Sequence, residues 1–131
     1  MQHDEFIGEV QARARLSSRG DAERATRAVL ETLGERLAGG QPHNLAAQLP
    51  EEIGRHLEGR RGVDKLSLDQ FFEKVSERTG ADLPDAIHQA RAVIAVVGEA
   101  ASQGEMDKVR QQLPEEYAPL FESGSEGQMQ R

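Results

Sequence analysis

An internal repeat constrains the fold of this chain more than any other feature of its sequence. The motif Gln-Leu-Pro-Glu-Glu at 48–52 recurs at 112–116, which is 64 positions later. At the same offset, further residues recur as identical short matches: 21–22 with 85–86, 27–29 with 91–93, 34–35 with 98–99, and Gly40 with Gly104. Upstream, Phe6 and Val10 match Phe71 and Val75 once a gap of one residue is allowed. Self-similarity at a fixed spacing indicates one structural unit present twice.

Each copy has the pattern of four helices. In the first copy, Ala22, Ala25, Val29 and Leu33 form an apolar stripe at helical spacing, and in the second Ser67 and Gln70 have the spacing of a capping box. We therefore predict an all-α bundle of about eight helices, built from two tandem four-helix repeats. The long helices are expected at 19–38 and 84–102, stopped by Gly40 and Gly104, with shorter helices before and after each of them.

The repeats define the expected domain organisation. Repeat one covers about 4–57 and repeat two about 67–121, with a linker at 58–66, so residues 1–121 form one helical domain. The tail 122–131 is rich in Gly, Ser and Gln and is expected to be disordered. Gly34 and Gly98 fall inside the long helices, where glycine costs roughly 1 kcal/mol relative to alanine. Their presence in both copies predicts a close helix crossing, or a ligand that approaches the backbone.

Composition narrows the class of protein. The chain has no cysteine, which excludes disulfides and zinc thiolates, and only 4% aromatic residues, which disfavours a sheet. Its N-terminus lacks the pattern of a signal peptide, and the apolar run at 92–97 is far shorter than the roughly 20 residues that span a bilayer. These features favour a cytoplasmic protein without membrane contact.

The charge distribution indicates the kind of partner. The net charge is −7, and residues 67–131 hold 12 acidic against 6 basic residues. An acidic protein is a poor match for nucleic acid, because binding to phosphate backbones is driven by positive charge. The acidic second half, which includes Asp69, Glu73, Glu77, Asp82 and Asp85, predicts a basic partner.

No catalytic pattern is present. The four histidines, His3, His43, His56 and His88, lack the spacing of metal ligands, and Gly39-Gly40 lacks the Lys and the Ser or Thr of a phosphate loop. Ser17, Ser18 and Ser67 have the positions of helix caps and turns. We therefore predict no catalytic residue, no metal site, no cofactor and no enzymatic activity.

Two sets of residues are candidates for a structural or binding role. Arg27 and Arg91 occupy the same place in each long helix, and we hypothesise that they pair with the glutamates of the repeated motif in their own copy: Glu51 and Glu52, or Glu115 and Glu116. An anion site at these arginines is the alternative. The glutamates begin helices in the predicted fold, which favours a structural role for them.

The second set is a basic patch formed by Arg55, Arg60, Arg61 and Lys65. Positive charge near a helix C-terminus is electrostatically favourable, and this structural interpretation is preferred over a docking site for an acidic protein surface or a phosphate. The neighbouring residues Glu51, Glu52 and Glu58 dilute its field.

The residues also suggest a family. The run Arg-Ala-Val-Leu-Glu-Thr-Leu-Gly-Glu-Arg-Leu at 27–37, together with both Gln-Leu-Pro-Glu-Glu motifs, resembles the bacterial family known as domain of unknown function 2267. The resemblance covers about residues 4–121. It implies a duplicated helical fold in a bacterial cytoplasm, and it implies no activity and no site residue.

The function is thus not fixed by the sequence, and three hypotheses remain. The first is a non-enzymatic interaction or scaffold module that binds another protein or itself, as a homodimer, because tandem helical pairs create grooves for partner helices. The second is a regulatory domain with a small-ligand or anion pocket lined by Arg27 or Arg91. The third, which the overall charge disfavours, is nucleic-acid binding through Arg55, Arg60, Arg61 and Lys65.

Overall fold

The computed structural model describes residues 1–59 and 65–122, and every regular element in these ranges is a helix. The predicted all-α class is therefore confirmed. The elements are α1 (His3–Ala14), α2 (Arg19–Arg36), α3 (Gln41–Ala46), α4 (Glu51–Gly54), the 3₁₀ helix η1 (Arg55–Leu57), α5 (Leu68–Thr79), α6 (Leu83–Ala100), α7 (Gln103–Gln112) and the 3₁₀ helix η2 (Glu115–Phe121). Because α4 continues directly into η1, the described residues form eight helical segments. Most of the linker and almost all of the predicted tail lie outside the described residues.

Helices α1 and α5 begin alike and end differently. The side chains of Gln2 and Ser67 cap their first turns, and each forms a capping box with the third helical residue. After the last turn of α5, Gly80 takes a left-handed conformation with φ 81°. Arg15 takes the same conformation after α1, with φ 56°, although it carries a side chain. The strain of a non-glycine residue in this region is thus confined to the first half.

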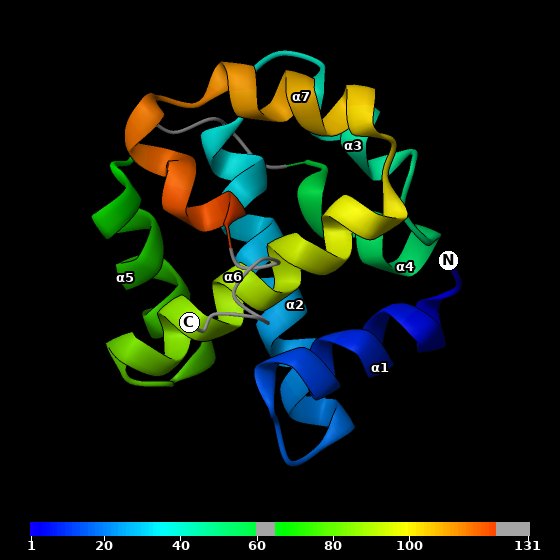
Figure 1. Cartoon of the computed structure of the whole chain (residues 1–131), viewed down its shortest axis with the longest axis vertical. Coiled ribbons are helices and arrows are strands. Elements are labelled where there is room, and N and C mark those ends of the chain that lie inside the picture. Colours follow the sequence, from blue (N-terminus) through cyan, green and yellow to red (C-terminus); the bar gives the residue numbers. More distant parts are fainter. Residues whose placement is uncertain (60–64, 123–131) are drawn as a thin grey trace.

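The long helices α2 and α6 are both 18 residues long and form the centre of the molecule (Figure 1). Ser18 and Asp82 accept hydrogen bonds from the first turn of each helix. The expectation that Gly40 and Gly104 stop these helices is wrong. The helices end earlier, where Leu37 and Ala101 turn to extended backbone, while Gly40 precedes α3 and Gly104 lies inside α7.

The short segments complete the fold. The second proline-containing motif begins η2 rather than an α-helix, because Pro119 inside this segment has no N–H to donate to the preceding turn. One hydrophobic cluster includes residues from α1, α2, α5 and α6 and from the short segments of both halves. Its largest fully buried side chains include Tyr117, Phe6, Phe71 and Ile7. The two predicted repeats therefore share one core.

Contacts between the halves are reciprocal. The amide of Ala38 donates to Gln112 Oε1 at 3.2 Å, and the amide of Ser102 donates to Gln48 Oε1 at 2.7 Å. Residue 38 corresponds to residue 102, and residue 48 to residue 112, because the members of each pair are 64 positions apart. Exchanging the two halves therefore converts the first hydrogen bond into the second.

Two further contacts follow the same rule. Gln41 of α3 donates to the carboxylate of Glu105 of α7, and both side chains are buried. These residues are again 64 positions apart, so each meets its own counterpart. Arg13 binds Glu99, and the corresponding Arg78 binds Glu35 at 2.7 Å. A two-fold rotation that superimposes one half on the other would exchange the two contacts of each such pair. The duplication itself stays an inference from the sequence.

Candidate functional site

The ion pairs predicted for the repeated arginines are not those that the structure contains. Arg27 Nε donates to Glu31 Oε2 at 2.9 Å, four residues along the same helix, so the predicted pairing of Arg27 with the glutamates of the repeated motif is wrong. Residues four apart lie on one face of a helix, and this proximity gives Glu31 the advantage.

The glutamates of the repeated motif lie at the surface. Glu51 and Glu52 form the first turn of α4, and Glu115 and Glu116 form the first turn of η2. All four are exposed, and in the described parts of the chain none of them forms a side-chain ion pair. Their position fits the structural role of carboxylates at the start of helices.

The predicted basic patch is only partly described. Arg55, at the start of η1, and Lys65, before α5, are both exposed. Arg60 and Arg61 lie outside the described residues. The patch therefore gives no geometry on which a site can be built.

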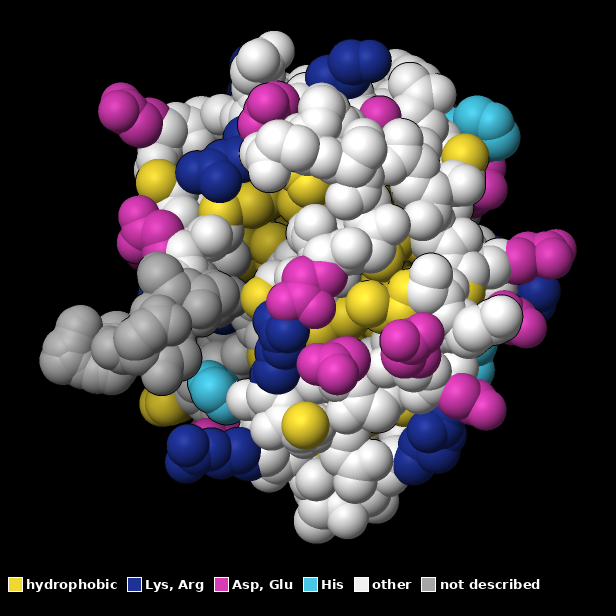
Figure 2. All heavy atoms as spheres, turned by 45° about the vertical axis from the view of Figure 1, so that its right-hand side comes forward, with side chains coloured by type: hydrophobic (Ala, Val, Ile, Leu, Met, Phe, Trp, Pro, Cys, Tyr) yellow, Lys and Arg dark blue, Asp and Glu magenta, His cyan; other side chains and the backbone are white. Residues whose placement is uncertain are grey.

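A large hollow runs along α6. It has a volume of about 740 Å³ and lies between the last turn of α1, the exposed face of α6, α7 and the end of η2. We call it the α6 groove. Its residues include Ala92, Ala95, Gly98, Met106 and Phe121, and hydrophobic side chains are visible between charged rims on the face drawn in Figure 2. The groove thus combines an apolar floor with a polar edge.

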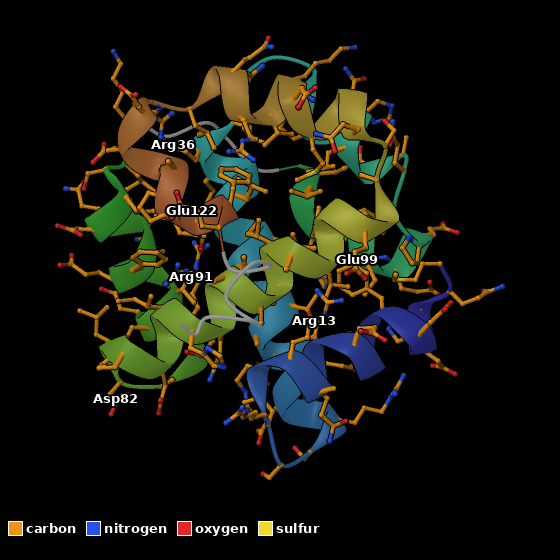
Figure 3. All side chains as sticks on the ribbon, viewed as in Figure 1. Arg13, Arg36, Asp82, Arg91, Glu99 and Glu122 are labelled. Atoms are coloured by element: carbon orange, nitrogen blue, oxygen red, sulfur yellow. The ribbon has the colours of Figure 1, made fainter. Side chains whose placement is uncertain are left out.

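Four arginines give this groove a positive charge. Arg13, Arg15, Arg91 and Arg110 line it together with His88, and Glu99 is the only carboxylate among its lining residues. Arg13 of α1 binds this Glu99 of α6 across the two helices, as Figure 3 shows. The excess of positive charge is notable because the whole chain has a net charge of −7. A concave site with one sign of charge attracts ligands of the other sign.

The arginines of the groove are held in different ways. The guanidinium carbon of Arg110 lies 4.9 Å from the centroid of the Phe121 ring, a cation–π contact that leaves its N–H groups able to donate. Arg15 is exposed and occupies the left-handed position after α1. Neither of these two side chains forms an ion pair within the part of the chain that the structure describes. Both can therefore contribute their charge to a ligand.

The corresponding positions of the first half explain how the groove became basic. Glu31, which binds Arg27, corresponds to Ala95, so Arg91 has no carboxylate four residues after it in α6. In the same alignment Arg110 corresponds to Ala46 of the first half. Arg15 corresponds to Gly80 of the second half, because the offset between the first helices of the two copies is 65. Three exchanges therefore increase the positive charge of the groove relative to the first half, and one, from Arg24 to His88, decreases it.

Gly98 also lines this groove. A Cβ atom built on Gly98 would meet only the Met106 Cε, at 3.9 Å, which is ordinary van der Waals contact. The close helix crossing predicted for Gly98 is therefore wrong, whereas Gly34 of the first half is buried. The alternative prediction, a ligand near the backbone, agrees with the location of Gly98 in the groove.

Sequence reasoning selected only one of the four arginines, Arg91. Arg13, Arg15 and Arg110 are far from it along the chain, and only the tertiary structure, in which α1 and η2 pack against α6, brings them together in one groove. A signal was nevertheless present in the repeat, since Ala95 and Arg15 differ in charge from their counterparts Glu31 and Gly80. The positions of the groove can therefore be found by asking where the two copies differ in charge, and not only where they are identical.

Other classes of site have no support in the described ranges. No group of three His, Cys, Asp or Glu side chains is arranged there to hold a metal ion. No described helix combines the length and apolarity needed to cross a bilayer.

The fold and the groove define a class: an all-helical domain with a basic groove along α6. The chain belongs to the family described as "Uncharacterized conserved protein (DUF2267)", whose model matches residues 3–120. The predicted family membership is thereby confirmed. A comparison with curated proteins finds no match.

Proposed function

We propose that the protein is a non-enzymatic binding module whose α6 groove takes an acidic segment of a partner protein. One observation carries this proposal: four arginines surround an apolar groove of about 740 Å³ on an otherwise acidic molecule. The acidic composition of the second half predicted a basic partner, whereas the arginines of the groove favour an acidic one. The family carries no assigned activity, and a bacterial cytoplasm stays the expected location.

The shape of the groove supports a helical or extended segment as its occupant. Ala92, Ala95 and Gly98 are small and three residues apart, so they allow a partner backbone to approach α6 closely. Met106 adds an adaptable apolar surface. An amphipathic acidic segment would place apolar side chains on this floor and carboxylates against the arginines of the rim.

A binding role also agrees with the chemistry of the lining residues. Glu99 is engaged by Arg13, and the other charged side chains of the groove are arginines, which stay protonated. Arginines hold anions well but do not transfer protons at neutral pH. The groove therefore suits recognition of charge, and we assign no catalytic residue to it.

The sharpest test restores the charge balance of the first half. Ala95→Glu places a carboxylate four residues after Arg91, as Glu31 stands after Arg27, and Arg110→Glu reverses a second charge. In affinity capture from the cells that make the protein, after nuclease treatment, we expect both variants to lose a partner that the unchanged protein retains. Added polyglutamate should release the same partner from the unchanged protein.

Matched controls separate the groove from general charge effects. Glu31→Ala makes the reverse exchange on α2, and Arg55→Glu reverses an exposed charge in the predicted basic patch. Both should retain the partner. Equal capture by all variants would refute the groove, and loss only in Arg55→Glu would move the interface to the basic patch. Capture of the protein's own second copy alone would replace the acidic partner by a homodimer.

A small anionic ligand in the same groove is the second candidate function. The presence of Arg91 in the groove favours it, as does a volume within the range of about 300–1,000 Å³ typical of small-molecule pockets. This candidate predicts a rise in melting temperature with multivalent organic anions, which Ala95→Glu would abolish. Saturable stabilisation by such an anion, without any captured protein, would favour this function over the first.

A further inference from the structure

A second hollow lies in the first half, away from the α6 groove. It has a volume of about 310 Å³, is open to solvent, and is bordered by α1, α2 and the segment formed by α4 and η1. We call it the first-half hollow. Polar residues from three different elements line it: His3 from α1, Thr26 from α2 and His56 from η1.

Three polar residues of this lining correspond to apolar residues in the second half. His3, Thr26 and His56 correspond to Leu68, Ala90 and Leu120 in the repeat alignment. These three counterparts are buried in the core. Polar side chains have therefore replaced apolar ones at positions that converge on one hollow, and this convergence is not needed by the helical fold.

Side-chain size changes at the same place. Ile7 and Ile53 of the first-half hollow correspond to Phe72 and Tyr117. In the second half both of these rings pack edge-to-face against Phe71, with centroids 6.2 Å and 5.9 Å from it. The first half thus has smaller side chains at two positions where the second half has aromatic rings, and both of these side chains line the hollow.

Thr26 gives a second and independent indication of a ligand. It is 1% exposed, it lines the hollow, and its Oγ1 has no hydrogen-bond partner in the described parts of the chain. Thr32 of the same helix, by contrast, donates to the carbonyl of Ala28 at 2.7 Å. A buried hydroxyl without a partner is destabilising, and such groups in native proteins commonly mark a missing water or ligand.

Two arginines set the charge that a ligand meets. Arg24 and Arg27 line the hollow, together with Glu23. Arg24 pairs with Asp21 at 3.1 Å and Arg27 with Glu31 at 2.9 Å, and both guanidinium groups lie on exposed side chains. The Arg24–Asp21 pair is exposed on both sides and therefore weak, and the Arg27 side chain is 68% exposed although Glu31 is only 15% exposed, so a bound anion can reach the N–H groups of both arginines.

We propose that the first-half hollow binds the oxyanion group of a small organic molecule, with the Thr26 hydroxyl as hydrogen-bond donor and Arg24 and Arg27 as its charge partners. The volume exceeds what a bare phosphate needs and matches the lower end of small-molecule pockets. This site is independent of the α6 groove. Free phosphate and a phosphorylated metabolite share the recognised chemistry, and the experiment distinguishes them.

Backbone-amide NMR titrations with inorganic phosphate and with glycerol 3-phosphate test the site. We expect saturable shifts at Thr26, Ile53 and His56, with the tighter binding for the organic phosphate. Thr26→Val keeps the shape of the side chain and removes the donor, so the affinity should fall about fivefold or more. Ile53→Tyr introduces the ring of the second half and should abolish the saturable shifts.

The controls make the outcome decisive. Lys108→Glu, which reverses an exposed charge on α7 that lines neither hollow, should leave the titration unchanged, and the dispersion of the amide spectrum reports whether each variant is folded. Equal affinity of Thr26→Val and the unchanged protein would overturn the proposal. So would shifts confined to Gly98 and the α6 groove, or shifts that rise linearly without saturation for both probes.

Discussion

At the scale of single residues, the halves differ in the residue that follows their first helix. Gly80 ends α5 in the left-handed region, where glycine carries no steric penalty, and Arg15 ends α1 in the same region with φ 56°. The left-handed conformation costs a side-chain-bearing residue about 1 kcal/mol or more. Strain of this kind persists where function requires the residue, and Arg15 lies at the rim of the α6 groove.

Arg15→Gly should therefore stabilise the protein and impair its proposed function. Glycine removes the steric cost, partly offset by a more flexible unfolded chain, and we expect the free energy of unfolding to rise by about 1 kcal/mol. Urea denaturation measures this change, and affinity capture measures the expected weakening of the acidic partner. A less stable variant would show that the Arg15 side chain makes contacts worth more than the strain.

Tyr117 should make the free energy of unfolding depend on pH in the alkaline range. Burial raises the pKa of its phenol above the ordinary value of 10.0, and the nearby Arg36 opposes the rise. Its hydroxyl donates to the Leu66 carbonyl at 2.7 Å, and the Arg36 guanidinium lies 5.4 Å from the ring centroid. The folded state thus retains the phenolic proton at a pH where the unfolded chain loses it.

The contribution of Tyr117 to stability should therefore be constant below pH 10.0 and fall above it. Tyr117→Phe should cost about 1 kcal/mol at neutral pH through the lost hydrogen bond, and this difference should shrink as the pH rises beyond about 10. Denaturation curves for both proteins between about pH 8 and about pH 11 measure the difference. A difference that grows with pH would contradict the raised pKa.

At the scale of elements, the approach of α3 to α4 sets the tightest limit on a side chain. A Cβ atom on Gly54 would lie 2.6 Å from the carbonyl oxygen of Ala46, and this oxygen belongs to the backbone. Such a clash can be relieved only if α4 moves away from α3. Helices α3 and α4, which flank the Pro-Glu-Glu motif of the first half, therefore pack against each other at Gly54. The second half has no glycine at the corresponding position.

Gly54→Ala should cost about 3 kcal/mol, because an overpacked contact with backbone cannot relax through a rotamer change. Gly98→Ala is the matched comparison, since its Cβ has room beside Met106 and alanine favours a helix interior. We expect that variant to gain up to about 1 kcal/mol. Thermal and urea unfolding measure both, and equal effects would show that packing at Gly54 is looser than the contact implies.

At the scale of the whole molecule, the two halves are held by the same contacts made in both directions. The pair Arg78–Glu35 joins α5 to α2, and the pair Arg13–Glu99 joins α1 to α6. Their environments differ: the side chains of the first pair are 24% and 12% exposed, and those of the second are 32% and 49% exposed. Arg78 also donates to Thr32 Oγ1 at 3.0 Å, which ties the first pair into a small network.

The two pairs should differ in energy although their residues correspond. Glu35→Ala leaves the half-buried Arg78 without its carboxylate and should cost about 3 kcal/mol. Glu99→Ala removes an exposed partner and should cost about 1 kcal/mol or less. Urea denaturation of the two variants compares them directly. Equal losses would mean that burial does not decide the strength of these pairs.

The sequence by itself determined the all-α class, the family and the approximate ends of the helices. Helical periodicity, capping residues such as Ser67 and the repeated motif are local features, and local features set local structure. The predicted ends of the long helices are wrong where they relied on glycines, since these helices end at Leu37 and Ala101, before Gly40 and Gly104.

Only the tertiary structure decided which side chains meet. Arg27 pairs with Glu31 and not with the predicted glutamates, because side chains four residues apart lie on the same face of a helix. The α6 groove and the first-half hollow each combine residues from several elements, and their contents depend on how α1, α6 and α7, or α1, α2 and η1, pack against one another. The repeat shows which positions correspond, but packing decides which positions become neighbours, because a helix fixes only the contacts along its own length.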